Sequence, residues 1–327
     1  VFAAHAENEI RELADLMQIP VITTMMGISV FPDDDQLFCG MIGTHGVKMA
    51  NAAVNECDVL FLVGARVGDR AVKTPLALEK TTKIIHIDID PAEIGKNIGA
   101  DLPLVGDAKL VLQQMTELAK PMKHDEWIAH IKTLGGERKY VEPAKGTVNP
   151  RVFIDRLAKK MPANVTVVAD VGQNQIWTCT EYKFRKEGRL LTSGGMGTMG
   201  YSVPAAIGAK MADNSRATVA ICGDGAFQMS FMELATAVQF GVDIKVVVMT
   251  NNRLGMVREL QTNGYHDRQT AVFLDGSPDF IKLAEAYGIP AMRVYDDDTM
   301  EKGVEMLAEH KGICLVEVVV DKDMPTL

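Results

Sequence analysis

The chain has 327 residues, a formal net charge of −9 and 47% hydrophobic residues; its length suits two domains of ordinary size, each with a substantial core. The acidic balance argues against a nucleic-acid surface, which usually shows a basic face. No run of about 18 apolar residues predicts a membrane span. The five scattered cysteines contain no Cys-x-x-Cys pair, which argues against a disulfide framework or zinc site and fits a reducing cytoplasm.

Short apolar runs alternate with amphipathic stretches along the whole chain, which is typical of parallel β-strands joined by helices. The pattern predicts an α/β protein with two doubly wound parallel-sheet domains. The strands expected from it are 21–23, 58–63, 83–87, 165–169, 218–222, 244–249 and 313–320. The helices expected from it are 7–17, 152–160, 203–211, 231–240 and 278–287.

A polar stretch from Gly135 to Gly146 has little hydrophobic periodicity and predicts a linker. Asn149-Pro150 follows as a helix-start signal, so we place the domain boundary near residue 145 and expect domains over 1–145 and 146–327. The first residues, beginning at Val1, resemble the end of a strand running into a helix and lack the features of a signal peptide. We therefore expect a truncated form of a longer protein.

The strongest motif is Gly223-Asp224-Gly225, which follows the predicted strand at 218–222. Asn251 lies 27 residues after Asp224, the length of one helix and one strand. A right-handed crossover would bring both residues to the carboxyl edge of the sheet. Carboxylate and amide oxygens suit Mg²⁺, and the glycines and helix N-termini suit a diphosphate. A plain turn is the alternative, but the spacing favours a metal–diphosphate site.

The first half carries a weaker nucleotide pattern. Gly64 follows the predicted strand at 58–63, and Asp88 comes 24 residues later at the end of the next strand. A glycine turn followed by an acid about 20 residues on is typical of dinucleotide-binding domains. The full Gly-x-Gly-x-x-Gly fingerprint is absent, so an ordinary turn and strand is the alternative at this point.

Taken together, these motifs resemble those of acetolactate synthases, which are thiamine-diphosphate enzymes, in the same order along nearly the whole chain. The second half adds the segments 170–177 (DVGQNQIW), 193–201 (SGGMGTMGY) and 255–261 (GMVRELQ). The first half adds 41–46 (MIGTHG), 64–70 (GARVGDR), 86–94 and 105–108 (VGDA). The resemblance implies a flavin-type central domain and a thiamine-diphosphate domain, without the pyrimidine-binding domain that precedes them in this family.

The resemblance also implies roles for single residues. Mg²⁺ would be held by the side chains of Asp224 and Asn251 and by the backbone carbonyl of Arg253, where relatives often carry an acid. Gln173 would donate to the diphosphate, and Met199 would hold the cofactor bent, unless it only fills the core. The full set of implied thiamine-diphosphate contacts is Gln173, Asn174, Gly197, Met199, Gly223, Asp224, Gly225, Ala226, Asn251 and Met256.

In the first half, the resemblance implies an FAD site. FAD would be structural, because acetolactate formation involves no net redox change. His45 lies in the matching loop, where a purely structural histidine is the alternative. The implied FAD contacts are His45, Gly64, Arg66, Arg70, Asp88, Ile89, Asp107 and Ala108.

The function implied by the resemblance is a transferase of branched-chain amino acid biosynthesis. It decarboxylates pyruvate and joins the product to a second 2-keto acid, giving 2-acetolactate or 2-aceto-2-hydroxybutyrate. The activating glutamate is expected in the pyrimidine domain, so we expect no catalytic residue here and no activity of this chain alone. Leu260 stands where Trp is common, which leaves the preference for pyruvate or 2-ketobutyrate open. A homodimer or homotetramer and a regulatory small subunit are the implied partners.

Three alternatives remain open from the sequence. The first is another thiamine-diphosphate enzyme, such as a 2-keto acid decarboxylase or a pyruvate oxidase, which would reduce its flavin during turnover. The second is a cofactor-binding fragment without catalysis. The third is a nicotinamide dehydrogenase, against which the broken glycine fingerprint and the lack of a placed catalytic histidine argue.

Overall fold

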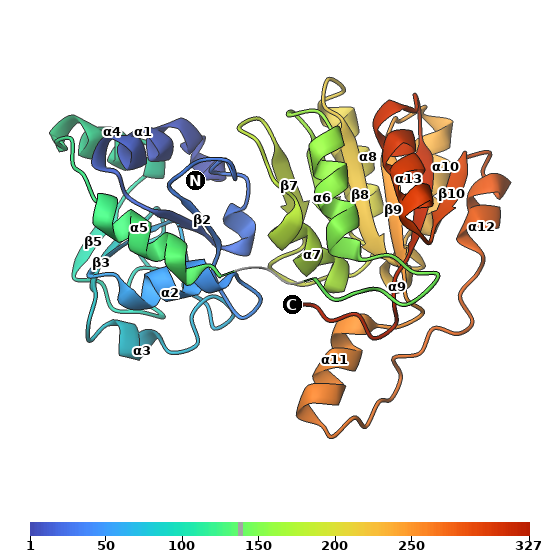
Figure 1. The fold of residues 1–327 in the computed structure, drawn as a ribbon. Coiled ribbons are helices and arrows are strands. Elements are labelled where there is room, and N and C mark those ends of the chain that lie inside the picture. The colour runs from blue at the N-terminus through green and yellow to red at the C-terminus, as the bar shows by residue number, and fades with distance from the viewer. Residues whose placement is uncertain (137–139) are drawn as a thin grey trace. The chain divides into compact units, whose positions relative to one another are not determined.

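The computed structural model describes residues 1–136 and 140–327 and divides the chain into two compact units, Val1–Arg138 and Lys139–Leu327 (Figure 1). Part of the predicted linker, residues 137–139, lies outside the described residues. From Tyr140 onward the linker packs on the second unit, since the Tyr140 hydroxyl donates to Glu181 at 3.1 Å and the Val141 carbonyl accepts from the Asn149 side chain at 2.9 Å. The units thus separate a few residues before position 145, where the sequence placed the domain boundary.

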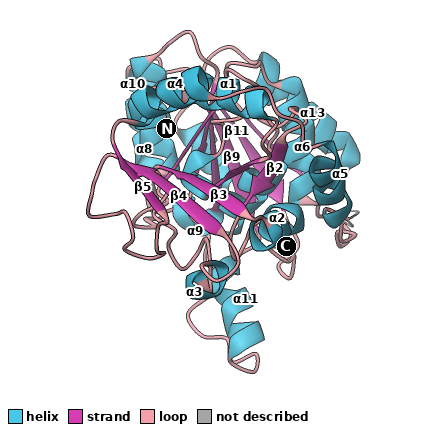
Figure 2. Ribbon diagram, turned by 90° about the vertical axis from the view of Figure 1, so that its left-hand side faces the viewer, coloured by secondary structure: helices cyan, strands magenta, loops and turns pink. Residues whose placement is uncertain are grey.

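The first unit contains two separate parallel sheets. In one sheet β1 (Val21–Thr23) pairs with β2 (Phe38–Met41), and in the other β4 (Lys83–Asp88) lies between β3 (Val59–Val63) and β5 (Leu102–Val105) (Figure 2). Helices surround these strands: α1 (Glu7–Met17), α2 (Lys48–Glu56), α3 (Pro75–Leu78), α4 (Ala108–Leu118) and α5 (Asp125–Leu134), with 3-10 turns at Phe2–Ala4 and Met25–Gly27. The buried side chains form several small clusters instead of one continuous core.

The second unit is built on one six-stranded parallel sheet with the order β10-β11-β9-β8-β6-β7. Its strands are β6 (Thr166–Ala169), β7 (Arg189–Thr192), β8 (Thr218–Gly223), β9 (Lys245–Thr250), β10 (Ala291–Val294) and β11 (Cys314–Val319). Its helices are α6 (Pro150–Lys160), α7 (Gln173–Glu181), α8 (Ser202–Ala212), α9 (Asp224–Phe227), α10 (Leu234–Gln239), α11 (Gly255–Gly264), α12 (Phe280–Ala286) and α13 (Asp297–Glu309), with a 3-10 turn at Phe231–Glu233.

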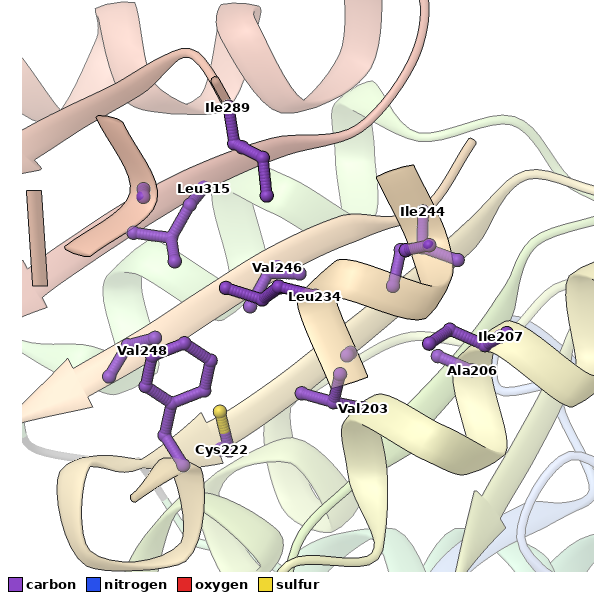
Figure 3. Packing of buried hydrophobic residues seen from close by; sticks show 14 of the residues in the cluster. Val203, Ala206, Ile207, Cys222, Leu234, Ile244, Val246, Val248, Ile289 and Leu315 are labelled. Carbon is purple, nitrogen blue, oxygen red and sulfur yellow. The ribbon is translucent and has the colours of Figure 1, made fainter. Parts of the chain in front are cut away.

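Helices cover both faces of this sheet. On one face α8, α10 and α12 pack over alternate strand residues such as Cys222, Val246 and Val248 (Figure 3). On the other face α6 packs against α7 and α13. Because both faces are covered, the central strands are buried along their length. Each large apolar side chain buried in this way contributes roughly 1.5–3 kcal/mol to the free energy of unfolding. The carboxyl ends of the strands are therefore held by a well-packed core.

The predicted α/β class with parallel sheets is confirmed, and the second unit is doubly wound as expected. Two details differ from the sequence prediction. The strands of the first unit form two sheets instead of one, and the helix expected over 231–240 is a 3-10 turn followed by α10. No helix among the described residues is long and apolar enough to cross a membrane.

Candidate cofactor and metal site

Asp224 lies at the carboxyl end of β8, where it begins α9, and its side chain is almost fully buried. Its Oδ1 accepts the N–H of Gly225 at 2.8 Å. Its Oδ2 accepts the N–H groups of Asn251 at 3.1 Å and Asn252 at 2.7 Å. The crossover predicted from the 27-residue spacing therefore brings the ends of β8 and β9 into contact.

Burial raises the pKa of Asp224 to about 6, although hydrogen bonds from the neighbouring N–H groups act in the opposite direction. A buried carboxylate without a cation is unfavourable in its charged form. A divalent cation at this oxygen would remove that penalty, because hard cations prefer carboxylate ligands. The electrostatics of Asp224 thus fit a metal ligand.

Asn251 and Arg253 form a tight turn after β9. The Asn251 Oδ1 accepts the Arg253 N–H at 3.1 Å, and Asn252 between them adopts a left-handed φ of 54°. The Arg253 side chain is held away on the following loop, where it pairs with Asp275 at 2.9 Å and lies 4.6 Å from the centre of the Phe273 ring. A contribution from Arg253 to a metal would therefore come from its backbone, as the resemblance implies.

Two glycines allow the backbone to approach closely at this edge. A Cβ at Gly225 would lie 2.7 Å from Cδ2 of Leu254 and 3.5 Å from Cε of Met199. A Cβ at Gly255 would lie only 1.9 Å from Oε1 of Gln173. A side chain at either position would force its neighbours to shift, because Met199, Gln173 of α7 and the start of α11 converge here around Asp224. This convergence fits a site where backbone closely approaches a diphosphate.

Asp170 anchors the glycine-rich loop that carries Gly197 and Met199. It is fully buried after β6, where its Oδ1 accepts the Gly200 N–H at 2.9 Å and its Oδ2 accepts the Ser202 N–H at 2.8 Å. The sequence motif that begins at Asp170 pointed to the diphosphate but predicted no role for Asp170 itself. The signal for it was an acid directly after a buried strand, the same signal that identified Asp224.

Gln173 and Asn174 lie at this edge, with their side-chain N–H groups engaged by the protein. Asn174 donates to the carbonyls of Asp170 at 2.8 Å and Ile221 at 3.2 Å. Gln173 donates to the Met324 carbonyl at 2.9 Å, and its Oε1 accepts from Asn251 at 3.2 Å. A phosphate contact would require exchange of these bonds, so the predicted phosphate role of both residues stays a prediction.

Sequence reasoning also missed the C-terminal segment beside α7 and α11. Gln173 donates to Thr326 at 3.2 Å, and Trp177 donates to the Pro325 carbonyl at 3.1 Å. The Thr326 N–H donates to Glu259 of α11 at 3.1 Å. This segment therefore ties the first turn of α7 to α11, on which the half-buried Met256 lies. The role of Met256 stays a prediction.

In the first unit, several residues predicted for FAD gather at the carboxyl ends of adjacent strands. Gly64 follows β3 with a left-handed φ of 62°, and its N–H donates to the Ile87 carbonyl at 2.8 Å. Asp88 ends β4, and its carbonyl accepts the Gly106 N–H at 3.0 Å just after β5. Asp107 then caps α4, whose first residue is Ala108.

The remaining residues predicted for FAD lie in loops of the same unit. The Thr44 N–H donates to the Arg70 carbonyl at 2.9 Å, which places the loop of His45 beside Arg70. The Arg66 carbonyl accepts from Asn97 at 2.7 Å, and the Ile89 side chain is exposed. The strand-end arrangement fits a dinucleotide, while the FAD contacts themselves stay predictions.

Comparison with known proteins agrees with this geometry. Residues 170–318 match the family described as "Thiamine pyrophosphate enzyme, C-terminal TPP binding domain", and residues 1–115 match "Thiamine pyrophosphate enzyme, central domain". The chain belongs to the thiamine pyrophosphate enzymes. The family predicted from the sequence is thereby confirmed.

The curated relatives narrow the class further. The chain is 40% identical to the probable acetolactate synthase large subunit of Methanocaldococcus jannaschii, over 98% of this chain and 56% of that protein. It is 36% identical to the acetolactate synthase large subunit of Lactococcus lactis, over 95% of this chain and 54% of that protein. It is 39% identical to the acetolactate synthase of Arthrospira platensis, over 98% and 57%. The chain spans about half the length of the curated relatives it matches.

Proposed function

We propose that this chain is the central and cofactor-binding part of an acetolactate synthase catalytic subunit. The whole enzyme would decarboxylate pyruvate and join the product to pyruvate or 2-ketobutyrate, which the similarity to acetolactate synthases supports. It would act in the cytoplasm, in branched-chain amino acid biosynthesis, as a homodimer or homotetramer with a regulatory small subunit. The chain alone would bind cofactor without turning over substrate.

The observation that carries this proposal is the buried Asp224 carboxylate, tied by two N–H groups to the turn after β9. Mg²⁺ would be held by Asp224, the Asn251 amide oxygen and the Arg253 carbonyl. When bound, thiamine diphosphate supplies the electron sink for decarboxylation of a 2-keto acid. Asp170 positions the Met199 loop, and the burial of Asp224 would help to keep water from the diphosphate end of a bound cofactor.

FAD would bind the first unit at the carboxyl ends of β3, β4 and β5. Gly64 allows a tight turn after β3 because it has no side chain. Asp88 ends the next strand, at the position where an acid usually binds the ribose of a dinucleotide. FAD would have a structural role. Flavin fluorescence during equilibrium dialysis measures this binding without any catalytic assay.

The test uses the full-length subunit, assayed for acetolactate from pyruvate with Mg²⁺, thiamine diphosphate and FAD. We expect Asp224→Ala to abolish product and Mg²⁺-dependent cofactor binding. Asp298→Ala, on the exposed first turn of α13, serves as the matched control and should retain both. Flavin reduction during turnover would identify a pyruvate oxidase, and acetaldehyde release a decarboxylase. Unchanged Mg²⁺ dependence in Asp224→Ala would refute the metal assignment.

A further inference from the structure

A cavity of about 480 Å³ lies in the second unit, at the carboxyl ends of β9, β10 and β11. Thr250 ends β9 and pairs in register with Val319, the last residue of β11, and both line the cavity. They lie on the same face of the sheet as Val248, the face that α12 covers. The segment leading into α12 supplies another wall, with Ser277 and Pro278. We call this space the β9–β11 cavity.

The β9–β11 cavity adjoins the Asp224 site, but its walls are largely different. Of the residues predicted to hold thiamine diphosphate or Mg²⁺, only Asn251 and Arg253 are among the described residues that line it. Both belong to the turn after β9, whose N–H groups donate to Asp224. A ligand in the β9–β11 cavity would therefore be separate from the cofactor and the metal.

The Thr250 hydroxyl is the observation that points to a ligand. Thr250 is only 8% exposed, and within the described residues its Oγ1 has no hydrogen-bond partner. A buried hydroxyl without a partner is unfavourable, and nearly all such groups bond to protein, water or a ligand. Because Thr250 lines the cavity, its partner is expected to come from the molecule that fills this space.

The charged groups of the cavity leave one cation unpaired. The ion pairs at its walls are Arg253–Asp275 at 2.9 Å, Arg293–Glu317 at 2.8 Å and Arg293–Asp279 at 3.1 Å. Lys322 also lines the cavity, and it makes no ion pair with any residue that the structure describes. The cavity therefore offers two groups without partners, the Lys322 ammonium and the Thr250 hydroxyl, and both can donate hydrogen bonds to an anion.

We propose that the β9–β11 cavity binds a small organic acid with one carboxylate and a short aliphatic body. The carboxylate accepts hydrogen bonds from the Thr250 hydroxyl and the Lys322 ammonium. The aliphatic body contacts the apolar walls, which include Pro278, Val319 and Val320. One negative charge balances the one unpaired cation, whereas a phosphate would bring up to two charges close to the acids of the cavity. The volume falls within the range of small-molecule sites.

The experiment measures binding to the 327-residue chain by saturation-transfer NMR, without cofactor or metal. The probes are isobutyrate, its uncharged isostere isobutyramide, and inorganic phosphate, which competes for the site if it binds there. Thr250→Val removes the hydroxyl and keeps the shape of the side chain. Its matched control is Thr218→Val, because Thr218 is also buried with an unpartnered hydroxyl but lies at the opposite end of the sheet, at the start of β8. Lys322→Gln removes the exposed ammonium.

We expect isobutyrate to bind saturably and isobutyramide to bind at least about tenfold more weakly, as expected when a charge-assisted hydrogen bond is lost. Thr250→Val should weaken isobutyrate about fivefold, the effect of one neutral hydrogen bond, and Thr218→Val should leave the affinity unchanged. Lys322→Gln should weaken it at least about threefold and make it less sensitive to salt. This last variant tests the proposal even if Thr250→Val is unstable. No readout requires turnover, so the result is independent of the proposed enzymatic function.

Four outcomes would overturn the proposal. The absence of saturable isobutyrate binding would show that the cavity holds only water. Equal affinity for isobutyramide would show that the carboxylate is not recognised. Phosphate that binds more tightly than isobutyrate and weakens in Lys322→Gln would assign the cavity to an inorganic anion. Equal isobutyrate affinity in Thr250→Val, Lys322→Gln and the unchanged chain would place the bound acid elsewhere on the molecule.

Discussion

The two units use the same local pattern of parallel strands and helices but bury it to different degrees. In the second unit one sheet is covered on both faces, and eighteen buried residues form a single cluster. In the first unit two short sheets flank a cavity, and the largest cluster among its described buried residues has six members. An apolar run therefore specifies a strand in both units, while the burial of that strand depends on how completely neighbouring elements cover it.

A matched pair of Phe→Ala substitutions tests whether the two units differ in packing. Phe227 is fully buried and meets Phe280 edge-on at 5.4 Å, whereas Phe61 lines the cavity and is only half-buried. We expect Phe227→Ala to lower the free energy of unfolding by about 3–5 kcal/mol. Phe61→Ala should lower it by about 1–2 kcal/mol, because less apolar surface is lost from contact.

Each unit contains one tryptophan, Trp127 in the first and Trp177 in the second. Denaturant unfolding can therefore be followed by fluorescence in Trp127→Phe and Trp177→Phe backgrounds, which assign each transition to its unit. Equal losses for the two Phe→Ala variants would show that the first unit is as tightly packed as the second.

The difference between the units also explains which elements the sequence revealed. Segments with clear apolar patterning were located closely: the helix predicted over 7–17 agrees with α1, and the strand predicted over 218–222 agrees with β8. Short strands at sheet edges were missed, including β5, β7 and β10. β5 is only four residues long, contains Pro103 and is largely exposed, so neither its composition nor its burial distinguishes it from a loop.

At the site, the sequence predicted which strand ends meet but not the hydrogen-bond partners of the side chains there. The Asp224–Asn251 spacing follows from crossover geometry, and the structure shows the two in contact. The hydrogen bond from the Gln173 side chain to the Met324 carbonyl could not be predicted, because the two residues lie 151 positions apart. The anchoring of the Gly200 backbone by Asp170 depends on tertiary folding in the same way.

The second prediction concerns pH, to which the two units should respond in opposite directions. Burial raises the pKa of Asp224 to about 6 from an ordinary value of 3.8. The folded form thus holds this proton more tightly than the unfolded chain, and its stabilising contribution is lost as pH rises from about 4 to about 6. The difference amounts to roughly 3 kcal/mol. Burial lowers the pKa of His86, so its contribution is lost as pH falls below about 6.5.

Unfolding followed separately in each unit measures both effects. In the second unit, Asp224→Asn should remove the loss between pH 4 and 6, and saturating Mg²⁺ with thiamine diphosphate should also suppress it. In the first unit, His86→Gln should reduce the loss of stability at acid pH. If the stability of the second unit depends on pH in the same way in Asp224→Asn as in the unchanged protein, burial of Asp224 is not the cause of that dependence.

The third prediction tests close approach at the site with two glycines on α11. Gly255→Ala places a Cβ within 1.9 Å of Gln173 Oε1, whereas a Cβ at Gly264 meets nothing within 4 Å. We expect Gly255→Ala to lower stability by about 1–3 kcal/mol through overpacking and to weaken thiamine-diphosphate binding at least tenfold. Gly264→Ala should be neutral or slightly stabilising. Calorimetric titration of cofactor into both variants checks this, and equal affinities would mean that Gln173 moves aside freely.

The smallest effect is expected at Arg253, where backbone and side chain are predicted to play separate parts. The guanidinium pairs with the largely exposed Asp275 and lies over Phe273, both on the loop between α11 and α12. Arg253→Ala should lower stability by about 0.5–1 kcal/mol, as expected for an exposed ion pair with a cation–π contact. The backbone carbonyl stays in place, so Mg²⁺ affinity should change less than about threefold, an effect of roughly 0.6 kcal/mol. A tenfold loss of Mg²⁺ affinity would show that the Arg253 side chain is needed to hold the turn. It would contradict the prediction that Arg253 contributes through its backbone carbonyl alone.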